Sequence, residues 1–152
     1  MTNFESLYGF FKDYPFPEWQ GQNRSMDDFF NAPEKYYNKS TPWYFRAKNY
    51  MSFDLGFDHE SAELGYIQHV IREMEDTYKL VMITDRYEES MILLKDMLCL
   101  DYEDIIYLPL KVRTDTDRKR VSSETAAKVK RWNRLDTAIY EYRWVFKMFC
   151  GA

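Results

Sequence analysis

The chain has 152 residues, enough for one ordinary domain, and its 45% hydrophobic and 30% charged residues are typical of a soluble globular protein. The formal net charge of −4 argues against a general nucleic-acid binder, because such modules present a basic surface. Two cysteines, Cys99 and Cys150, are too few for a disulfide framework. His59 and His69 stand too far apart to share a helical face, so no metal site is expected.

No segment approaches the ~20 consecutive apolar residues of a membrane-spanning helix, and the N-terminus lacks the basic-then-apolar pattern of a signal peptide. On this basis alone the chain is expected to be neither anchored nor secreted. Two Asn-x-Ser sequons, at Asn23 and Asn38, would suit a lumenal protein, although chance alone can supply such tripeptides.

The N-terminal half predicts helices separated by aromatic loops. Residues 2–14 have apolar side chains at helical spacing and are followed by two prolines. Ser25 and Asp28 have the spacing of a capping box, which predicts a short helix over residues 26–31. Residues 33–49 are aromatic and are expected to be irregular. A turn around Gly56 then leads into a predicted helix over residues 59–77.

Residues 79–108 follow the pattern of an α/β layer. The short apolar run at 79–84 predicts a buried strand. Asp85, with Glu88 three residues later, predicts a capped helix that ends near Cys99, whose thiol is expected to be buried. The run at 105–110 predicts a second strand or a short helix, broken by Pro109.

The C-terminal part predicts a charged loop and two helices. Residues 111–121 form a charge run that is expected to be exposed. Ser122 or Ser123 caps a helix that extends to about Trp132, and a second helix begins near Leu135. Helices dominate, and a sheet of so few strands is rarely a complete fold, so the pattern itself suggests part of a larger domain.

Several separated segments, in the same order, resemble the C-terminal half of the galactose-3-O-sulfotransferase family, which includes galactosylceramide sulfotransferase. The resemblance covers most of the chain, and its specificity comes from the number and order of the segments. They are Phe4-Glu5-Ser6, Asn31-Ala32-Pro33-Glu34-x-Tyr36-Tyr37, Phe53-Asp54-Leu55-Gly56-Phe57-Asp58, the junction at 85–98, Leu98-Cys99-Leu100-Asp101 with Asp104, and Trp132-Asn133-x-Leu135-Asp136.

This resemblance implies a helix-rich α/β fold, namely the C-terminal portion of a P-loop-NTPase-like sulfotransferase domain with few strands. Residues 1–152 would then form a partial domain that lacks the loop holding the 5'-phosphosulfate. The five glycines are scattered, and none belongs to a Gly-Lys-Thr type turn. The family also implies a Golgi membrane location on the lumenal side, with a membrane anchor in a segment absent from this chain.

The family's cosubstrate is 3'-phosphoadenosine-5'-phosphosulfate (PAPS), and its acceptor is the 3-hydroxyl of galactose on a glycolipid or glycan. Ser6 matches the serine that holds the 3'-phosphate, and the matching arginine would stand two residues before Met1. Arg113 matches a family arginine in the charged loop, which could contact an anionic cofactor or form a solvated charge run. On sequence alone, Ser6 also fits an ordinary solvated helix serine.

Asp85 and Glu88 are the candidate acceptor-binding residues, because carboxylates at the end of a strand could hold sugar hydroxyls or supply the catalytic base. Helix capping explains the same two residues equally well. Three functional hypotheses therefore stand: part of a carbohydrate sulfotransferase, a catalytically silent truncated product, and a helical protein-interaction module.

Overall fold

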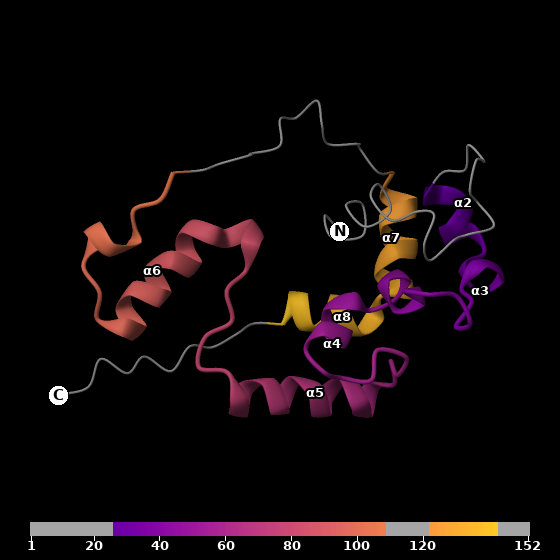
Figure 1. Cartoon of the computed structure of the whole chain (residues 1–152), viewed down its shortest axis with the longest axis horizontal. Helices are drawn as coiled ribbons and strands as arrows, with labels where there is room; N and C mark the ends of the chain where they lie inside the picture. The colour runs from indigo at the N-terminus through magenta and orange to yellow at the C-terminus, as the bar shows by residue number, and fades with distance from the viewer. Residues whose placement is uncertain (1–25, 109–121, 143–152) are drawn as a thin grey trace. The chain divides into compact units, whose positions relative to one another are not determined.

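The structure is a computed structural model that describes residues 26–108 and 122–142. Figure 1 shows that the regular elements of these residues are helices, and no β-strand occurs among them. The helix-rich character expected from the sequence is confirmed, whereas the strand predicted at 79–84 is not found. The expected segments at 2–14 and 111–121 lie outside the described residues. The chain divides into two compact units, of which the first contains residues 26–68 and 122–141 and the second contains residues 69–108 and 142.

In the first unit, α2 (Met26–Asn31) packs against α7 (Ser123–Trp132), as Figure 1 shows. The hydroxyl of Thr125 donates to the Asp27 carboxylate, and the Lys128 ammonium donates to Asn31 Oδ1 at 2.8 Å. These bonds tie the two helices together along one side of an apolar core. That core consists of Phe29, Phe30, Ala47 and Val129, with Tyr36, Tyr37 and Trp132 packed against it.

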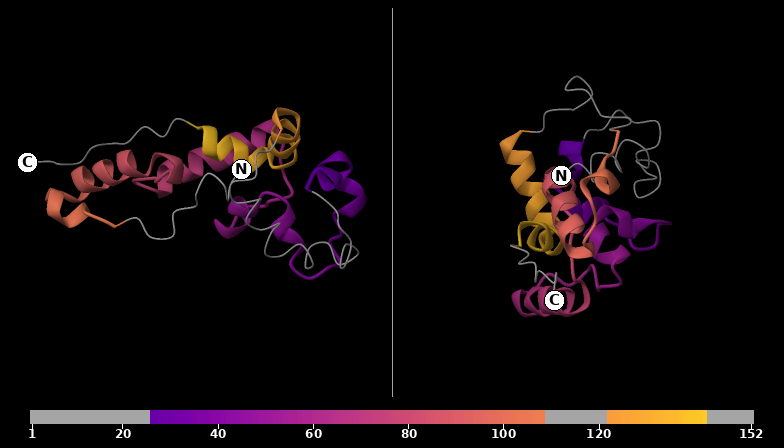
Figure 2. Two further views of the ribbon diagram at one scale, coloured as in Figure 1. Left: turned by 90° about the horizontal axis from the view of Figure 1, so that it is seen from above. Right: turned by 90° about the vertical axis from the view of Figure 1, so that its left-hand side faces the viewer.

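The bounds of α2 and α7 confirm the sequence prediction. Of the two candidate caps for α7, Ser122 is the one used, because its side chain accepts a hydrogen bond from Thr125 N–H at 3.1 Å. A turn at Asn133 separates α7 from α8 (Arg134–Glu141), and Figures 1 and 2 show the two helices running in sharply different directions. Leu135 and Ile139 are the buried residues of α8.

The region predicted as irregular, 33–49, contains two short helices. Helix α3 (Pro33–Tyr36) has a proline at its first position, where a missing N–H costs nothing. The 3₁₀ helix η2 spans Tyr44–Ala47 and is followed by α4 (Tyr50–Asp54). The turn predicted around Gly56 is present, with φ at 84°.

Helix α5 (Leu64–Thr77) ends where predicted but begins five residues later than expected. The Asp58 side chain explains the late start, because it accepts from Glu60 N–H at 3.0 Å and from the Ser61 hydroxyl at 2.8 Å. These bonds hold the chain in a local turn. The buried residues of α5 are Ile67, Val70, Ile71 and Met74, whereas Leu64 is 61% exposed.

The second unit contains the segment that the sequence predicted to be a strand. Residues 80–83 have no regular structure, and they lead through the 3₁₀ helix η3 (Thr84–Arg86) into α6 (Tyr87–Leu98). Ile83 N–H donates to the buried Ser90 hydroxyl at 3.0 Å, and that hydroxyl also bonds Arg86 C=O at 2.9 Å. The backbone N–H and C=O groups of a strand need hydrogen-bond partners in a neighbouring strand. Here the Ser90 hydroxyl of α6 accepts the hydrogen bond from Ile83 N–H instead.

The predicted capping box of α6 is also wrong. The helix begins at Tyr87, two residues after Asp85, and its N-cap residue, Arg86, makes no side-chain capping bond. A capping box does occur after the helix, in the 3₁₀ helix η4 (Tyr102–Ile105), where Asp101 N–H donates to Asp104 Oδ2 at 2.9 Å. Only its last residue, Ile105, belongs to the run predicted as a second strand or a short helix. Residues 106–108 have no regular structure, and the residues after Leu108 lie outside the described part of the chain.

Candidate functional site

The start of α4 and the start of α8 cap each other. Asn49 is fully buried and has a left-handed backbone with φ at 43°. Its Oδ1 accepts from the N–H groups of Leu135 and Asp136 at 3.2 and 3.3 Å, and its Nδ2 donates to His59 C=O at 2.7 Å. Its own N–H donates to Asn133 Oδ1 at 2.8 Å. Asn49 therefore satisfies the first turn of a helix that lies far along the chain.

Asp136 caps the first turn of α4 in the same way. One carboxylate oxygen accepts from Met51 N–H at 3.0 Å, and the other accepts from Ser52 N–H at 2.9 Å and from the Ser52 hydroxyl at 2.5 Å. A carboxylate at this end of a helix compensates the partial positive charge of the free N–H groups. Burial raises the pKa of Asp136 above 3.8, although the hydrogen bonds from Ser52 and Met51 act in the opposite direction.

We call Asn49, Ser52, Asn133 and Asp136 the reciprocal cap. It is reinforced on one side by Trp132, whose indole N–H donates to Ala47 C=O at 2.7 Å. Asn133 also anchors the turn between α7 and α8, because its Nδ2 donates to Val129 C=O at 3.1 Å. The cap thus joins residues 47–52 firmly to residues 132–136.

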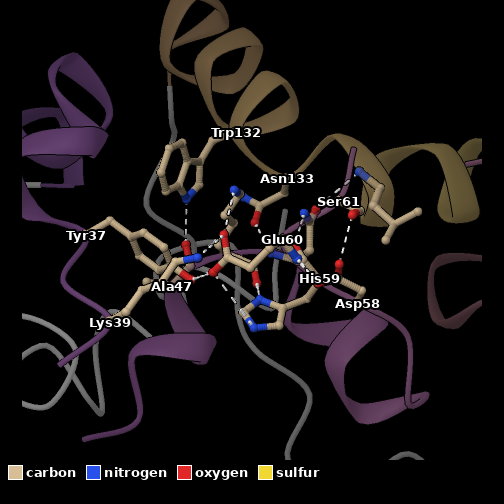
Figure 3. Close-up of polar contacts among 12 residues, drawn as sticks. Tyr37, Lys39, Ala47, Asp58, His59, Glu60, Ser61, Trp132 and Asn133 are labelled. Atoms are coloured by element: carbon tan, nitrogen blue, oxygen red, sulfur yellow. Dashed lines mark hydrogen bonds and ion pairs between the residues drawn. The ribbon is translucent and has the colours of Figure 1, made fainter. Parts of the chain in front are cut away.

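A second polar group, the Glu60 cluster, lies beside this junction, as Figure 3 shows. Its members are Tyr37, Lys39, Lys48 and Glu60. The Tyr37 hydroxyl donates to Glu60 Oε1, and Lys48 and Lys39 contact Glu60 Oε2 at 3.1 and 3.3 Å. The Lys48 ammonium also lies 5.2 Å from the centre of the Trp132 ring. One half-buried carboxylate therefore gathers three side chains from residues 37–48.

His59 connects the two groups. It is buried, and its Nδ1 lies 3.0 Å from the carbonyl oxygen of Lys48. Because a carbonyl only accepts, Nδ1 carries a proton, and in the neutral ring Nε2 is the acceptor, 4.0 Å from Glu60 Oε1. His59 C=O is in turn the acceptor for Asn49 Nδ2. His59 is thereby held at its imidazole ring and at its main-chain carbonyl.

The electrostatics of the Glu60 cluster favour positioning over proton transfer. Burial alone would raise the pKa of Glu60, but hydrogen bonds from Tyr37 and Lys48 and the attraction of Lys48 outweigh it, so the pKa lies below 4.5. Burial and the hydrogen bond to Glu60 raise the pKa of Tyr37 far above its ordinary value of 10.0. Glu60 is thus a weak base and Tyr37 a weak acid at neutral pH.

Comparison with known proteins decides the family. The model of the family described as Galactose-3-O-sulfotransferase matches residues 1–146. The chain belongs to the galactose-3-O-sulfotransferase family. It is 33% identical to mouse galactose-3-O-sulfotransferase 3 over 143 residues and 35% identical to mouse galactose-3-O-sulfotransferase 2 over 140 residues. It is also 30% identical to human galactosylceramide sulfotransferase over 141 residues.

Each of these alignments covers 91% of the chain but only 33–35% of the relative. The chain therefore spans about one third of the length of the galactose-3-O-sulfotransferases that it matches. No solved structure matches it. Within residues 26–108 and 122–142, no helix combines the length and the apolar character required to cross a lipid bilayer. The same residues contain no group of three or more His, Cys, Asp or Glu side chains placed to hold a metal ion.

One of the segments that suggested the galactose-3-O-sulfotransferase family, 132–136, supplies Asn133 and Asp136 to the reciprocal cap. The other two members, Asn49 and Ser52, lie directly before the segment at 53–58. Sequence reasoning used these segments only as evidence of resemblance and did not predict that Asn49, Ser52 or Glu60 would matter. The available signal was the set of short polar side chains at 49–52 and 133–136, beside Trp132. It is visible only when these two parts of the chain are considered together.

The predicted acceptor-binding residues both lie in the second unit. Asp85 is exposed in η3, and Glu88 is exposed in the first turn of α6. Their proposed contact with a sugar stays a prediction. The predicted cofactor-binding residues Ser6 and Arg113, and the sequon at Asn23, lie outside the described residues.

Asn38, the other sequon residue, is exposed in a turn where its Oδ1 accepts from Ser40 N–H at 2.9 Å. The prediction of a buried Cys99 thiol is wrong. Cys99 is exposed and follows α6 in the left-handed conformation, with φ at 53°. This helix-terminating position directs the residue away from the apolar face, and the neighbouring Leu98 is itself 54% exposed. His69 is a surface residue, with its Nε2 3.3 Å from the Glu73 carboxylate.

Proposed function

We propose that this chain forms the acceptor-side part of a sulfotransferase that transfers sulfate from PAPS to the 3-hydroxyl of galactose on a glycolipid or glycan. The observation that carries the proposal is the family match over residues 1–146. The printed names of the relatives supply galactose and galactosylceramide as acceptors. Membership in the same family supports a related acceptor for this protein.

PAPS would supply an activated sulfuryl group, and the protein would position the acceptor hydroxyl for in-line attack and remove its proton. Lys39 and Lys48 both contact the Glu60 carboxylate, which would compete with the anionic end of PAPS for these two cations. Donor binding is accordingly assigned to Ser6 and Arg113, together with residues beyond the matched third of the relatives.

Asp85 and Glu88 are proposed to hold acceptor hydroxyls. Both carboxylates are exposed, and each can accept hydrogen bonds from two neighbouring hydroxyl groups of a sugar. The reciprocal cap and the Glu60 cluster would fix the loops at 37–60 without contacting the reacting atoms. Their role is positioning, because their polar groups are occupied by one another.

A catalytically silent product is the alternative. A helical interaction module is the third possibility. It predicts a monodisperse isolated chain whose thermal stability does not respond to PAPS. The location proposed for the protein is the lumenal side of the Golgi membrane, on the basis of family membership.

The decisive experiment places this chain in the context of a relative. The matching 143 residues of mouse galactose-3-O-sulfotransferase 3 are replaced by the present chain, and transfer of radiolabelled sulfate from PAPS to galactosylceramide and to lactose is measured. We expect transfer by the chimera and none by the 152-residue chain alone. The control is the chimera with both Asp85→Asn and Glu88→Gln, in which we expect a higher KM for the acceptor. A chimera that is folded and monodisperse but inactive would contradict the proposal.

The proposed lumenal location has a separate test at Asn38. When the chain is directed into the secretory pathway of a mammalian cell, we expect a glycan at this exposed sequon. Treatment with an N-glycosidase should then increase the electrophoretic mobility of the wild type more than that of the Asn38→Gln variant. Equal shifts for the two proteins would show that Asn38 is not an acceptor.

A further inference from the structure

The first unit also has an exposed aromatic surface. We call its three members, Trp43, Phe45 and Phe53, the aromatic platform. The rings of Phe45 and Phe53 are stacked, with centroids 4.0 Å apart and an interplanar angle of 18°, and the Trp43 ring lies 5.9 Å from that of Phe45. Trp43 is 45% exposed and Phe53 is 40% exposed. Two large apolar side chains thus remain in contact with solvent around one stacked pair.

Trp43 has an unusual backbone for its size. Its φ and ψ are 65° and 16°, which is the left-handed region that bulky residues rarely adopt. A residue held in this region indicates that the surrounding structure compensates the strain, and such residues occur often in ligand-binding sites. The guanidinium carbon of Arg46 lies 4.5 Å from the centre of the Trp43 ring. This cation–π contact orients the indole, which remains 45% exposed to solvent.

Hydrogen bonds hold the backbone on which the aromatic platform lies. Arg46 N–H donates to Trp43 C=O at 3.0 Å within the first turn of η2. Two residues after Phe45, Ala47 C=O is held by the indole N–H of Trp132. Phe53 belongs to α4, whose first turn is capped by Asp136. Both ends of the platform are therefore fixed to residues 132–136, which limits the entropy lost when a ligand binds.

We propose that the aromatic platform binds the galactose ring of the acceptor, an inference that rests on the proposed function. In β-galactosides the axial 4-hydroxyl leaves the C–H groups of carbons 3, 4 and 5 on one continuous apolar face. Such a face is complementary to an exposed indole, whereas the hydroxyl groups point to the edges of the ring and remain available for hydrogen bonds. The platform is thus suited to holding galactose while its 3-hydroxyl stays accessible.

The test measures galactoside binding and uses the strain at Trp43 to separate binding from folding. Trp43→Gly removes the indole but relieves the left-handed backbone, so the variant is expected to remain folded. Tyr140→Ala is the control, because Tyr140 is a comparably exposed aromatic residue of α8, at 40%. Saturation-transfer NMR of the full 152-residue chain with methyl β-galactoside and methyl β-glucoside reads binding directly, and circular dichroism checks the fold.

We expect saturation of the galactoside protons at carbons 3 to 5 in the wild type and in Tyr140→Ala, and its loss in Trp43→Gly. The glucoside should show at least about tenfold weaker binding, because its equatorial 4-hydroxyl interrupts the apolar face. In the chimera described above, Trp43→Gly should raise the KM for lactose about tenfold with little change in kcat.

Two results would overturn the inference. One is galactoside binding by folded Trp43→Gly that equals the wild type, which would leave the sulfotransferase proposal intact if the chimera is active. The other is loss of circular dichroism in Trp43→Gly together with wild-type binding in the milder Trp43→Leu variant. That combination would show that the indole is packed against other parts of the protein and serves only the fold.

Discussion

Asp136 shows how much a single side chain contributes when it is the acceptor for a distant helix. Both of its carboxylate oxygens accept from backbone N–H groups at the start of α4. No neutral side chain of the same shape offers two such acceptors, since an asparagine presents an NH₂ group in place of one oxygen. The ionised form of the residue is therefore important for stability.

We predict that Asp136→Asn lowers the free energy of unfolding by about 1–3 kcal/mol, because one N–H donor in the first turn of α4 loses its acceptor. Urea denaturation of the 152-residue chain measures the change. Asp54→Asn is the matched control, since Asp54 is exposed at the other end of the same helix, and it should change stability by less than about 0.5 kcal/mol. Equal effects of the two substitutions would contradict the capping role.

The lowered pKa of Glu60 predicts how the stability of the folded protein changes with pH. A carboxyl group whose pKa is lower in the folded state stabilises the protein above its unfolded pKa, near 4.5, and this contribution is lost as the pH falls through the folded value. We expect Glu60→Gln to be less stable than the wild type by about 1–3 kcal/mol at pH 7.

That difference should shrink steadily below pH 4.5. Asp58, whose pKa is lowered mainly by its hydrogen bond from Ser61, contributes equally to both proteins and cancels in the comparison. Thermal denaturation between pH 3 and pH 7 provides the measurement, with Glu63→Gln at an exposed position as the control. A difference that is constant with pH would exclude the assigned ion pairs.

At the level of elements, Ser90 determines the shape of the segment that precedes α6. Its hydroxyl bonds both Ile83 N–H and Arg86 C=O. We predict that Ser90→Ala increases hydrogen exchange at Ile83 by about tenfold, which corresponds to the loss of about 1.4 kcal/mol of local protection. Ser123→Ala, at the exposed first position of α7, is the control. Unchanged exchange at Ile83 would show that another group protects it.

Several elements were predictable from the sequence because their signals are local. The apolar spacing and cap of α7, the short α2 and the end of α5 depend on neighbouring residues only, and these predictions are confirmed. The capping box at Asp85 was wrong because the same spacing occurs by chance, and Arg86 forms the junction with α6 instead. The strand at 79–84 was wrong because an apolar run cannot specify whether a partner strand is present.

The candidate site was less predictable than the elements. Asn49 and Asp136 act on helices that lie far from them in the sequence, and neither has a local pattern that indicates this role. The family segments did identify the right part of the chain at 132–136, although not its contact with residues 49–52. Exposure of Trp43 and its left-handed backbone were beyond sequence reasoning, because glycine or asparagine is the usual residue at such a position.

At the scale of the whole molecule, the reciprocal cap belongs to one compact unit and Ser90 to the other. We predict that Asp136→Asn and Ser90→Ala act additively, with the stability of the double variant within about 0.5 kcal/mol of the sum. Urea denaturation of the four proteins completes the cycle. A coupling energy above about 1 kcal/mol would show that the two units communicate energetically.

The long separation between the two halves of the reciprocal cap, 84 to 87 residues, bears on how the protein is made. Translation proceeds from the N-terminus at about 5–20 residues per second. Roughly 4 to 17 s therefore pass between the synthesis of Asn49 and that of its partners Asn133 and Asp136. During that interval the nascent polypeptide exposes Phe29 and Phe30 without the helix that covers them, and chaperones are the natural protection. A premature stop codon before residue 133 would make this vulnerable interval permanent and direct the product to quality control.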